Sequence, residues 1–209
     1  MARALENQSE LLFRSGQLDQ TIEVLKQVLA IRQRGLGPES ELVGRTWISL
    51  GPVYAHANRL DESEAAFETG IGILKKKLGD RHPDLAAAYK GYAELRVRQR
   101  RLTEGEKLAR EGLSIRMERL GASSGGTVDS QVGLADIIRE RRSTSRYPEA
   151  EALLLSARTT AIAARGVEDA GAIKATQGLV QLYDDWHKPA ESAKWRAELP
   201  AGQDAGVSP

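Results

Sequence analysis

Residues 47–67, WISLGPVYAHANRLDESEAAF, decide the fold of this chain. Trp47, Leu50 and Tyr54 follow one another at steps of three and four residues, which places their side chains on one face of an α-helix. Gly51 lies on the same face, where the lack of a side chain lets a second helix approach closely. This half of the stretch predicts the first helix of a packed pair.

The second half of the stretch predicts the partner helix. Ser63 is the small residue at the crossing of the two helices, and Phe67, one turn later, is the large residue that fills the contact. Asp61 is expected to cap this helix, with Glu64 completing a capping box. The residues equivalent to Ser63 in the rest of the chain are all small: Thr21, Gly105, Ala150 and Ser192.

The pattern repeats along the chain at a fixed step. Leu36-Gly37 is followed 42 residues later by Leu78-Gly79 and 42 later again by Leu120-Gly121, whereas Arg165-Gly166 follows after 45. Turn sequences keep the same step at residues 16–19, 58–61, 100–103, 145–148 and 187–190, and three residues inserted around 142–145 explain the longer interval. Two markers with one period predict an all-α fold, a right-handed α-solenoid of about five antiparallel helix pairs.

The expected helices fall into pairs. Their ranges are 2–15 with 19–35, 39–57 with 61–78, 82–99 with 103–120, 127–143 with 148–164, and 168–186 with 189–198. The corresponding units are 1–36, 37–78, 79–120, 121–165 and 166–199, which together form one solenoid domain, 1–199. Residues 200–209 are expected to form a disordered tail.

The sequence resembles a known repeat family. The pattern Trp47-x2-Leu50-Gly51-x2-Tyr54 followed by Ser63-x3-Phe67 is similar to the tetratricopeptide repeat, with serine at the usual alanine position. The 42-residue period and the linker LGDRHPD at residues 78–84 resemble the kinesin-light-chain-like subfamily of these repeats. The resemblance covers about residues 1–199 and implies first helices that line a concave groove for a protein or peptide.

Two further features bear on this resemblance. The paired asparagines that such repeats often carry on the first helix are replaced here by Ile48-Ser49, Lys90-Gly91, Val132-Gly133 and Gln177-Gly178, so recognition of a peptide backbone by asparagine amides is not expected. Residues 182–191 are similar to the closing unit of arrays found behind bacterial serine/threonine kinase domains, which implies a place in bacterial signalling. The chain itself has no kinase signature.

Composition excludes several classes of function. The 209 residues include no cysteine, which excludes thiol catalysis, disulfide frameworks and thiolate metal sites. The 30 Lys and Arg residues nearly balance the 29 Asp and Glu residues, so no global charge favours nucleic acid or an acidic membrane. Since the sequence lacks a long apolar run and its start does not resemble a secretory signal, we expect a cytoplasmic protein without a membrane partner.

No arrangement of residues points to catalysis, a cofactor or a metal. His56, His82 and His187 lie in different repeats without metal-ligand spacing, and His82 is expected to start a helix together with Pro83. No serine lies in a Gly-x-Ser-x-Gly context, and the glycine pair at 125–126 does not follow a strand, as a phosphate-binding loop would. We therefore predict a protein that is not an enzyme and holds no cofactor or metal.

The helix face opposite the packing stripe is the expected binding surface. At about 100° per residue, Arg45, Ile48 and Pro52 point away from Trp47 and Leu50. The same register gives the other groove residues: Lys90, Glu94, Val97, Arg98, Val132, Asp136, Arg139, Gln177 and Gln181, with Arg3, Glu6, Glu10, Phe13 and Arg14 in the first repeat. An apolar strip with basic groups at its centre and acidic groups toward the C-terminus suits an extended or helical peptide.

Pro52 lies inside the expected helix 39–57, where it removes one backbone hydrogen bond at a cost of roughly 3 kcal/mol. A kink is expected there, and the freed carbonyl group of Ile48 would face the groove. Two interpretations stay open: strain that has no function, and a carbonyl that accepts a hydrogen bond from a ligand.

Two arginine clusters support a rival hypothesis. They end successive first helices and consist of Arg96, Arg98, Arg100 and Arg101, and of Arg139, Arg141, Arg142 and Arg146. Through residues 96–101 and 139–146 the chain would bind nucleic acid or a phosphoprotein; the alternative is a solvated helix end favoured by the helix dipole. Few aromatic residues interrupt the clusters, which argues against stacking on single-stranded nucleic acid.

The sequence as a whole predicts a non-catalytic scaffold for a protein or peptide partner. The terminal repeats lack an evident polar cap, so homo-association or fusion to a larger signalling protein is a further expectation. Nucleic acid is not the expected partner.

Overall fold

The computed structural model describes residues 2–200, and every regular element among them is helical. In chain order these are α1 (Ala2–Arg14), α2 (Leu18–Leu36), α3 (Glu41–His56), α4 (Leu60–Leu78), α5 (Pro83–Arg98), α6 (Leu102–Leu120), α7 (Gly125–Glu140), the 3-10 helix η1 (Thr144–Arg146), α8 (Tyr147–Arg165), α9 (Ala170–Asp185) and α10 (Pro189–Arg196). The all-α prediction is confirmed, and each expected helix is found with its ends within three residues of the predicted ones.

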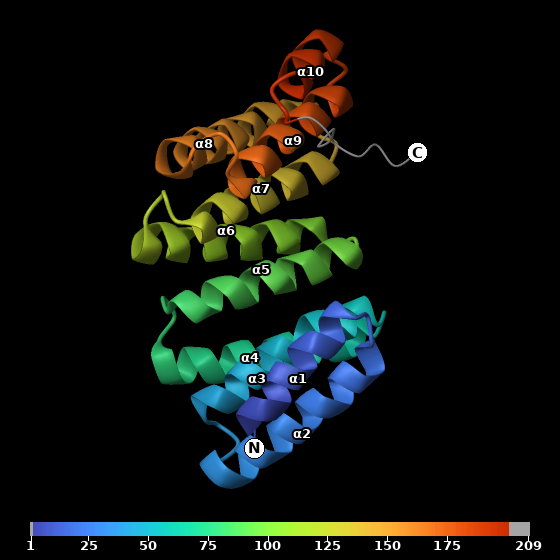
Figure 1. Ribbon diagram of the computed structural model, residues 1–209, viewed down its shortest axis with the longest axis vertical. Helices are drawn as coiled ribbons and strands as arrows, with labels where there is room; N and C mark the ends of the chain where they lie inside the picture. The colour runs from blue at the N-terminus through green and yellow to red at the C-terminus, as the bar shows by residue number, and fades with distance from the viewer. Residues whose placement is uncertain (1, 201–209) are drawn as a thin grey trace. The chain divides into compact units, whose positions relative to one another are not determined.

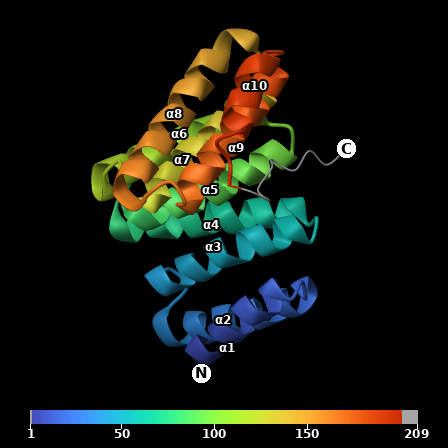
Figure 2. The same ribbon diagram turned by 45° about the horizontal axis from the view of Figure 1, so that its top comes forward.

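The helices form two compact units, with α1–α5 in residues 1–101 and α6–α10 in residues 102–209. In unit 1, α1 packs against α2 and α3 against α4 as antiparallel pairs (Figure 1). The pairs are stacked in sequence, because α2 also contacts α3 and α4 contacts α5. Figure 2 shows the pair of α3 and α4 side by side from a second direction.

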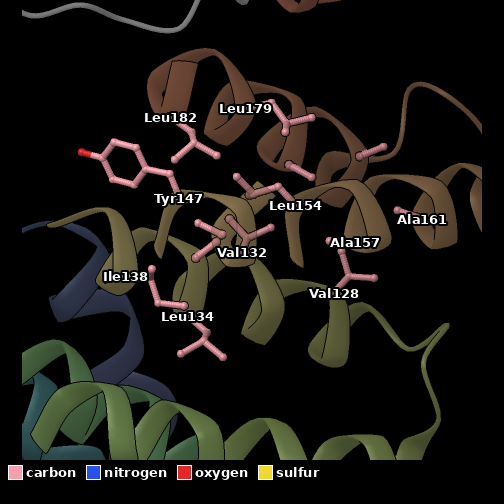
Figure 3. Packing of buried hydrophobic residues seen from close by; sticks show 14 of the residues in the cluster. Val128, Val132, Leu134, Ile138, Tyr147, Leu154, Ala157, Ala161, Leu179 and Leu182 are labelled. Carbon is pink, nitrogen blue, oxygen red and sulfur yellow. The ribbon is translucent and has the colours of Figure 1, made fainter. Parts of the chain in front are cut away.

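In unit 2 the same order of contacts recurs. The pairs are α7 with α8 and α9 with α10, while α6 packs against α7 and α8 against α9. The core between them is apolar: Leu134 and Ile138 of α7, Leu154 of α8 and Leu179 of α9 are all buried in it (Figure 3). Each unit therefore has the stacked helix pairs that the period predicts.

The motif residues of the second repeat pack as expected. Leu50, Gly51, Tyr54, Ser63 and Phe67 are buried, and the partly buried Trp47 packs against the same core. The Ser63 hydroxyl donates a hydrogen bond to the carbonyl oxygen of Gly51 (2.7 Å). A β-carbon at Gly51 would come within 2.6 Å of the Phe67 ring, so the close approach of α3 and α4 requires glycine there.

The first helix of each pair ends in a tight turn. At this turn one residue has a φ between 51° and 76°: Gly16, Asn58, Arg100, Arg142 and His187. After Asn58, the N–H group of Arg59 donates to the carbonyl oxygen of Tyr54 (2.8 Å), which is the six-to-one bond of a Schellman motif. The next helix then starts without a side-chain cap.

This turn overturns one expectation. The prediction that Asp61 caps α4 is wrong, because the helix begins at Leu60 and Arg59 occupies the cap position. The Schellman turn leads the chain into the helix one residue earlier than a side-chain cap would. Asp61 therefore lies in the first turn, and Glu64 binds elsewhere, as described below.

The turn after α7 is longer, as predicted. Arg142 has a φ of 51°, and the inserted residues that follow form the short helix η1 before α8 begins. The inserted residues thus lengthen one turn and leave the helices on either side at their usual lengths of 16 and 19 residues.

The linkers between pairs depend on a different backbone conformation. Gly37, Gly79 and Gly166 end the second helices with φ between 80° and 91° and ψ between 156° and 173°, a region that is essentially restricted to glycine. Three residues after each of these glycines, and after Gly121, a side chain caps the next helix: Ser40, His82, Ser124 and Asp169. His82 accepts a hydrogen bond from the N–H group of Asp84 (3.2 Å), which confirms its predicted role at the start of a helix.

Among the described helices, none is both long and apolar enough to span a bilayer. The predicted tail, 200–209, lies outside the described residues except for Pro200.

Candidate functional site

Unit 1 contains a pocket of about 340 Å³ between its first three helices. Its lining comes from α1 (Glu6, Ser9, Glu10, Phe13), α2 (Thr21, Leu25) and α3 (Ser49, Pro52, Val53). Four of these residues, Glu6, Glu10, Phe13 and Pro52, were assigned to the groove by the helix register. The structure brings them together at one place.

The hydroxyl groups in this pocket are already engaged with their own helices. Ser9 donates to the carbonyl oxygen of Glu6 (2.8 Å), Thr21 to that of Gln17 (2.8 Å), and Ser49 to that of Arg45 (3.1 Å). A ligand therefore meets mainly the apolar atoms of these side chains.

The two carboxylates of the pocket differ in how strongly they are held. Glu6 binds the buried Arg32 of α2 through both oxygens, with each contact at 2.6 Å. Glu10 accepts one hydrogen bond from Arg14 (2.7 Å) across two exposed side chains. Exposed pairs of this kind contribute little to stability, so Glu10 can exchange Arg14 for a cation of a ligand.

Phe13 extends the pocket toward the ends of α1 and α3. Its ring meets His56 edge to face, with the two ring centroids 5.4 Å apart. Pro52 forms part of the opposite wall on α3, which continues as an α-helix from Glu41 to His56 across the proline. The proline thus presents a rigid apolar surface to the pocket.

The other groove residues predicted on α3 and α5 are bound to neighbouring groups. Arg45 lies 2.5 Å from Asp84 and 2.7 Å from Glu41. Arg98 donates to the carbonyl oxygen of Ala55 (2.6 Å). Val97 is half-buried, and the Nζ atom of Lys90 lies 3.6 Å from the exposed Glu94.

The register assigns Ile48 and Val132 to the groove; in the structure Ile48 is half-buried and Val132 is buried. The Ile48 side chain fills the space above Gly70 of α4, where a β-carbon would come within 2.7 Å of it. Val132, at the equivalent position two repeats later, is buried in the core of unit 2 (Figure 3). A first helix packs against its own partner and against the next pair, so its free face is narrower than the half-helix that the register allowed.

In unit 2 the remaining predicted residues lie on α7 and α9. Arg139 lies 2.9 Å from Asp185 and 3.7 Å from Asp136. Burial raises the pKa of Asp136, partly offset by the positive charge of Arg139. Gln177 and Gln181 of α9 are half-buried.

The first arginine cluster is mainly engaged with one carboxylate. Glu64 of α4 accepts two hydrogen bonds from Arg96 (2.6 and 2.7 Å) and one from Gln99 (3.0 Å), and Arg101 lies 3.4 Å away. The hydrogen bonds from Arg96 lower the pKa of Glu64 to about 2. Only 5% of the Arg96 side chain is exposed, so its charge is not available to a polyanion.

The second cluster is arranged in the same way, 42 residues further along. Glu106 of α6 accepts two hydrogen bonds from Arg146 (both 2.9 Å), one from Arg141 (3.0 Å) and two from Arg110 (2.8 and 3.0 Å). Arg146 is the main cause that lowers the pKa of Glu106 to about 2. These arginines join the end of α7 and the start of α8 to α6.

Sequence reasoning missed the function of these two glutamates. Glu64 was assigned to a helix cap and Glu106 was not singled out, although the 42-residue step relates them. Within the described residues, no group of three or more potential metal ligands comes together. The three histidines serve as an aromatic contact, a helix cap and a turn residue.

Known proteins show similarity at the level of the repeat and the fold. Residues 1–76 match the tetratricopeptide repeat family. No curated protein sequence matches the chain. The tetratricopeptide repeat is generally a protein–protein interaction module.

Solved structures extend the similarity over most of the chain. One contains nearly identical TPR-like repeats described as those of a kinesin light chain from Podosopora anserina, with 20% identity, a TM-score of 0.79, and coverage of 94% of this chain and 92% of that one. A single-substitution variant of that protein gives 20% identity, a TM-score of 0.78, and coverage of 94% and 93%. BtubC (BKLC) from P. vanneervenii gives 14% identity, a TM-score of 0.79, and coverage of 91% and 75%.

Proposed function

We propose that the chain is a non-catalytic scaffold, and that the pocket of unit 1 binds an apolar side chain from an extended or helical segment of a protein partner. The observation that carries this proposal is the 340 Å³ pocket, formed by three helices and lined by Phe13, Leu25, Pro52 and Val53. A concave site of this size with apolar walls suits one anchor side chain.

The polar groups of the pocket support an apolar anchor. The hydroxyl groups of Ser9, Thr21 and Ser49 already donate to backbone carbonyl oxygens, and Glu6 is neutralised by Arg32. The pocket therefore offers no free hydroxyl proton to a polar anchor, whereas an apolar anchor gains from burial.

Glu10 adds a preference for charge next to the anchor. Among the described residues its partner is Arg14, and both side chains are more than half exposed. A lysine or arginine of the partner, close in sequence to the apolar anchor, can replace Arg14 there. The partner motif is therefore an apolar residue accompanied by a basic one.

Selection of peptides tests this proposal directly. A displayed library of random peptides is bound to the wild-type protein after depletion on a Phe13→Ser, Glu10→Arg variant. We expect enriched peptides that pair an apolar residue with a basic residue, and we expect the double variant to lose their binding. The matched control is Leu11→Ser with Glu23→Arg, which changes an exposed leucine and an exposed glutamate outside the pocket and should leave binding intact.

Peptides that bind the double variant and the wild type equally well would place the binding site elsewhere. Enriched sequences without an apolar residue would contradict the anchor itself. Circular dichroism of both variants checks that each is folded.

The other parts of the predicted surface belong to the proposal as additional contacts. They comprise Arg45, Lys90, Glu94, Val97, Arg98, Asp136, Arg139, Gln177 and Gln181, and they are secondary because several are engaged with neighbouring side chains. Coupling to a signalling enzyme stays a prediction that depends on the resemblance of residues 182–191. Nucleic-acid binding gains no support, since Glu64 and Glu106 occupy arginines of both clusters.

A further inference from the structure

An arginine of unit 1 has a complete set of partners on three helices. Arg32 of α2 donates through Nη1 to the hydroxyl of Thr46 (2.8 Å) and to the carbonyl oxygen of Leu42 (3.4 Å), both on α3. Its second nitrogen, Nη2, donates to Oε2 of Glu6 of α1 (2.6 Å), and Nη1 also lies 2.6 Å from Oε1 of the same carboxylate. The side chain is 9% exposed, and the carboxylate balances its charge.

The same arrangement occurs in unit 2, 84 residues further along the chain. Arg116 of α6 donates through Nη1 to the hydroxyl of Ser130 (2.7 Å) and to the carbonyl oxygen of Gly126 (2.6 Å), both on α7. Ser130 and Gly126 are the counterparts of Thr46 and Leu42 at that interval. Arg32 and Arg116 thus occupy equivalent positions, and each binds a hydroxyl group and a carbonyl group of the following helix. We call this arrangement the arginine cradle.

The cradle of unit 2 has no carboxylate. Nη2 and Nε of Arg116 form no hydrogen bond or ion pair with the described residues. Asp129 acts on Arg116 only through its charge and lies 3.6 Å from Lys174. Burial lowers the pKa of Arg116 below its ordinary value, as expected for a guanidinium group that is desolvated without a bound anion.

We propose that Arg116 and Ser130 form a binding site for a carboxylate group of a protein partner. The ligand would bind Nη2 and Nε of Arg116, which no described residue occupies, whereas Glu6 contacts Nη2 and Nη1 of Arg32. Two parallel N–H groups of a guanidinium group can donate to the two oxygens of one carboxylate. The hydrogen bonds of Nη1 to α7 hold the guanidinium group in position. Ser130 is buried and accepts a hydrogen bond from Nη1, so its part in the site is to position the guanidinium group.

This site is separate from the pocket of unit 1 and rests on the proposed function only in that the carboxylate belongs to a protein. If the proposal is right, the part of the partner that contacts unit 2 carries an acidic residue. The pocket of unit 1 selects an apolar and a basic residue, so the two sites select opposite charges.

Nuclear magnetic resonance of arginine Nε–H groups in the whole chain tests the site, with sodium acetate as the probe and sodium chloride as the reference at equal ionic strength. Arg116→Lys and Arg32→Lys variants assign the two signals. We expect the Arg116 signal to half-saturate at an acetate concentration about tenfold lower than that of the exposed Arg34, while Arg32 does not respond.

A matched variant opens the equivalent site in unit 1. Glu6→Gln removes the carboxylate from Arg32, and Arg32 should then respond to acetate as Arg116 does in the wild type. If Arg116 responds no more strongly than Arg34, or if inorganic phosphate saturates it at a lower concentration than acetate, the carboxylate site is overturned.

A blocked tripeptide with a central glutamate identifies the source of the ligand. Saturation of Arg116 by this tripeptide, but not by its glutamine analogue, supports a carboxylate that arrives on a polypeptide. A response to acetate without a response to the tripeptide overturns the protein source. These outcomes are independent of the peptide selection on unit 1, so either proposal can fail alone.

Discussion

Units 1 and 2 differ in the side chain that a second helix packs against the next first helix. We call this side chain the wedge. In unit 1, Phe67 of α4 lies so close to α5 that a β-carbon at Gly91 would come within 2.9 Å of its ring. In unit 2 the equivalent residue is Ala109 of α6, and a β-carbon at the equivalent Gly133 of α7 would meet nothing within 4 Å. Packing therefore requires glycine at position 91 of α5 in unit 1, but it does not require glycine at position 133 of α7 in unit 2.

The polar contact at the same interface is present in both units. Glu64 and Glu106 occupy the same repeat position, and each binds arginines at the end of the next first helix and in the turn that follows it. The interface of α4 with α5 thus combines a carboxylate with the Phe67 wedge, whereas that of α6 with α7 has the carboxylate and no such wedge. Stability along the chain is expected to follow these two contacts, since each pair contacts only its neighbours.

Removing the wedge of unit 1 is expected to have the largest effect. Phe67 is 1% exposed and stacks on Tyr92 with ring centroids 5.5 Å apart, so Phe67→Ala should destabilise the protein by about 3–5 kcal/mol. Urea unfolding followed by circular dichroism measures this loss. The matched change in unit 2, Ala109→Leu, should cost less than about 1 kcal/mol, because Gly133 leaves room for the larger side chain. Equal losses in the two variants would contradict the difference between the units.

Substitution of the interface carboxylate is also expected to destabilise the protein more in unit 1 than in unit 2. Glu64→Gln leaves Arg96, only 5% exposed, without its main partner, and should cost about 3 kcal/mol. Glu106→Gln should cost about 1 kcal/mol, because Arg141 and Arg146 are 32% and 28% exposed and stay partly hydrated. The same urea experiment measures both. A larger loss for Glu106→Gln would show that the missing wedge, rather than exposure, sets the strength of the polar contact.

Acid should weaken both interfaces. The pKa values of Glu64 and Glu106 are lowered from 4.5 to about 2 in the folded chain, so the folded state holds its carboxylates ionised while the unfolded state already binds protons. Their contribution is complete above pH 4.5 and declines as the pH falls toward 2, by about 1–3 kcal/mol for each carboxylate. Thermal unfolding between pH 6 and pH 2 measures the decline. Its slope should be shallower in a Glu64→Gln, Glu106→Gln double variant.

Much of the fold could be predicted because its constraints leave marks at fixed intervals. The linker conformation of Gly79 admits only glycine, and the crossing of α3 and α4 admits only small residues, so both recur every 42 residues. The start of α4 could not be predicted from capping rules, because a Schellman turn after Asn58 replaces the cap expected at Asp61.

The candidate site could be predicted in part. Helix register was enough to gather Glu6, Glu10, Phe13 and Pro52 on one face, and the structure joins them in a pocket. It did not indicate that Val132 is buried, because a helix packed on two sides has a narrower free face than the periodicity of one helix indicates. The partners of Glu64 lie 32 to 37 residues away, so only the three-dimensional stacking of the pairs could have revealed them.

The smallest expected effect separates the two kinds of glycine within unit 2 itself. Gly133→Ala should stabilise the protein by about 0.5–1 kcal/mol, because alanine favours the helix and its methyl group meets open space. Gly178→Ala, at the equivalent position of α9, should destabilise it, because the new β-carbon would lie 2.6 Å from Cδ2 of the buried Leu154. Comparison of the two unfolding midpoints in urea measures the difference. If both alanine variants are more stable than the wild type, the Leu154 side chain can move aside. The close contact between a wedge and the glycine opposite it would then not set the distance between successive helix pairs.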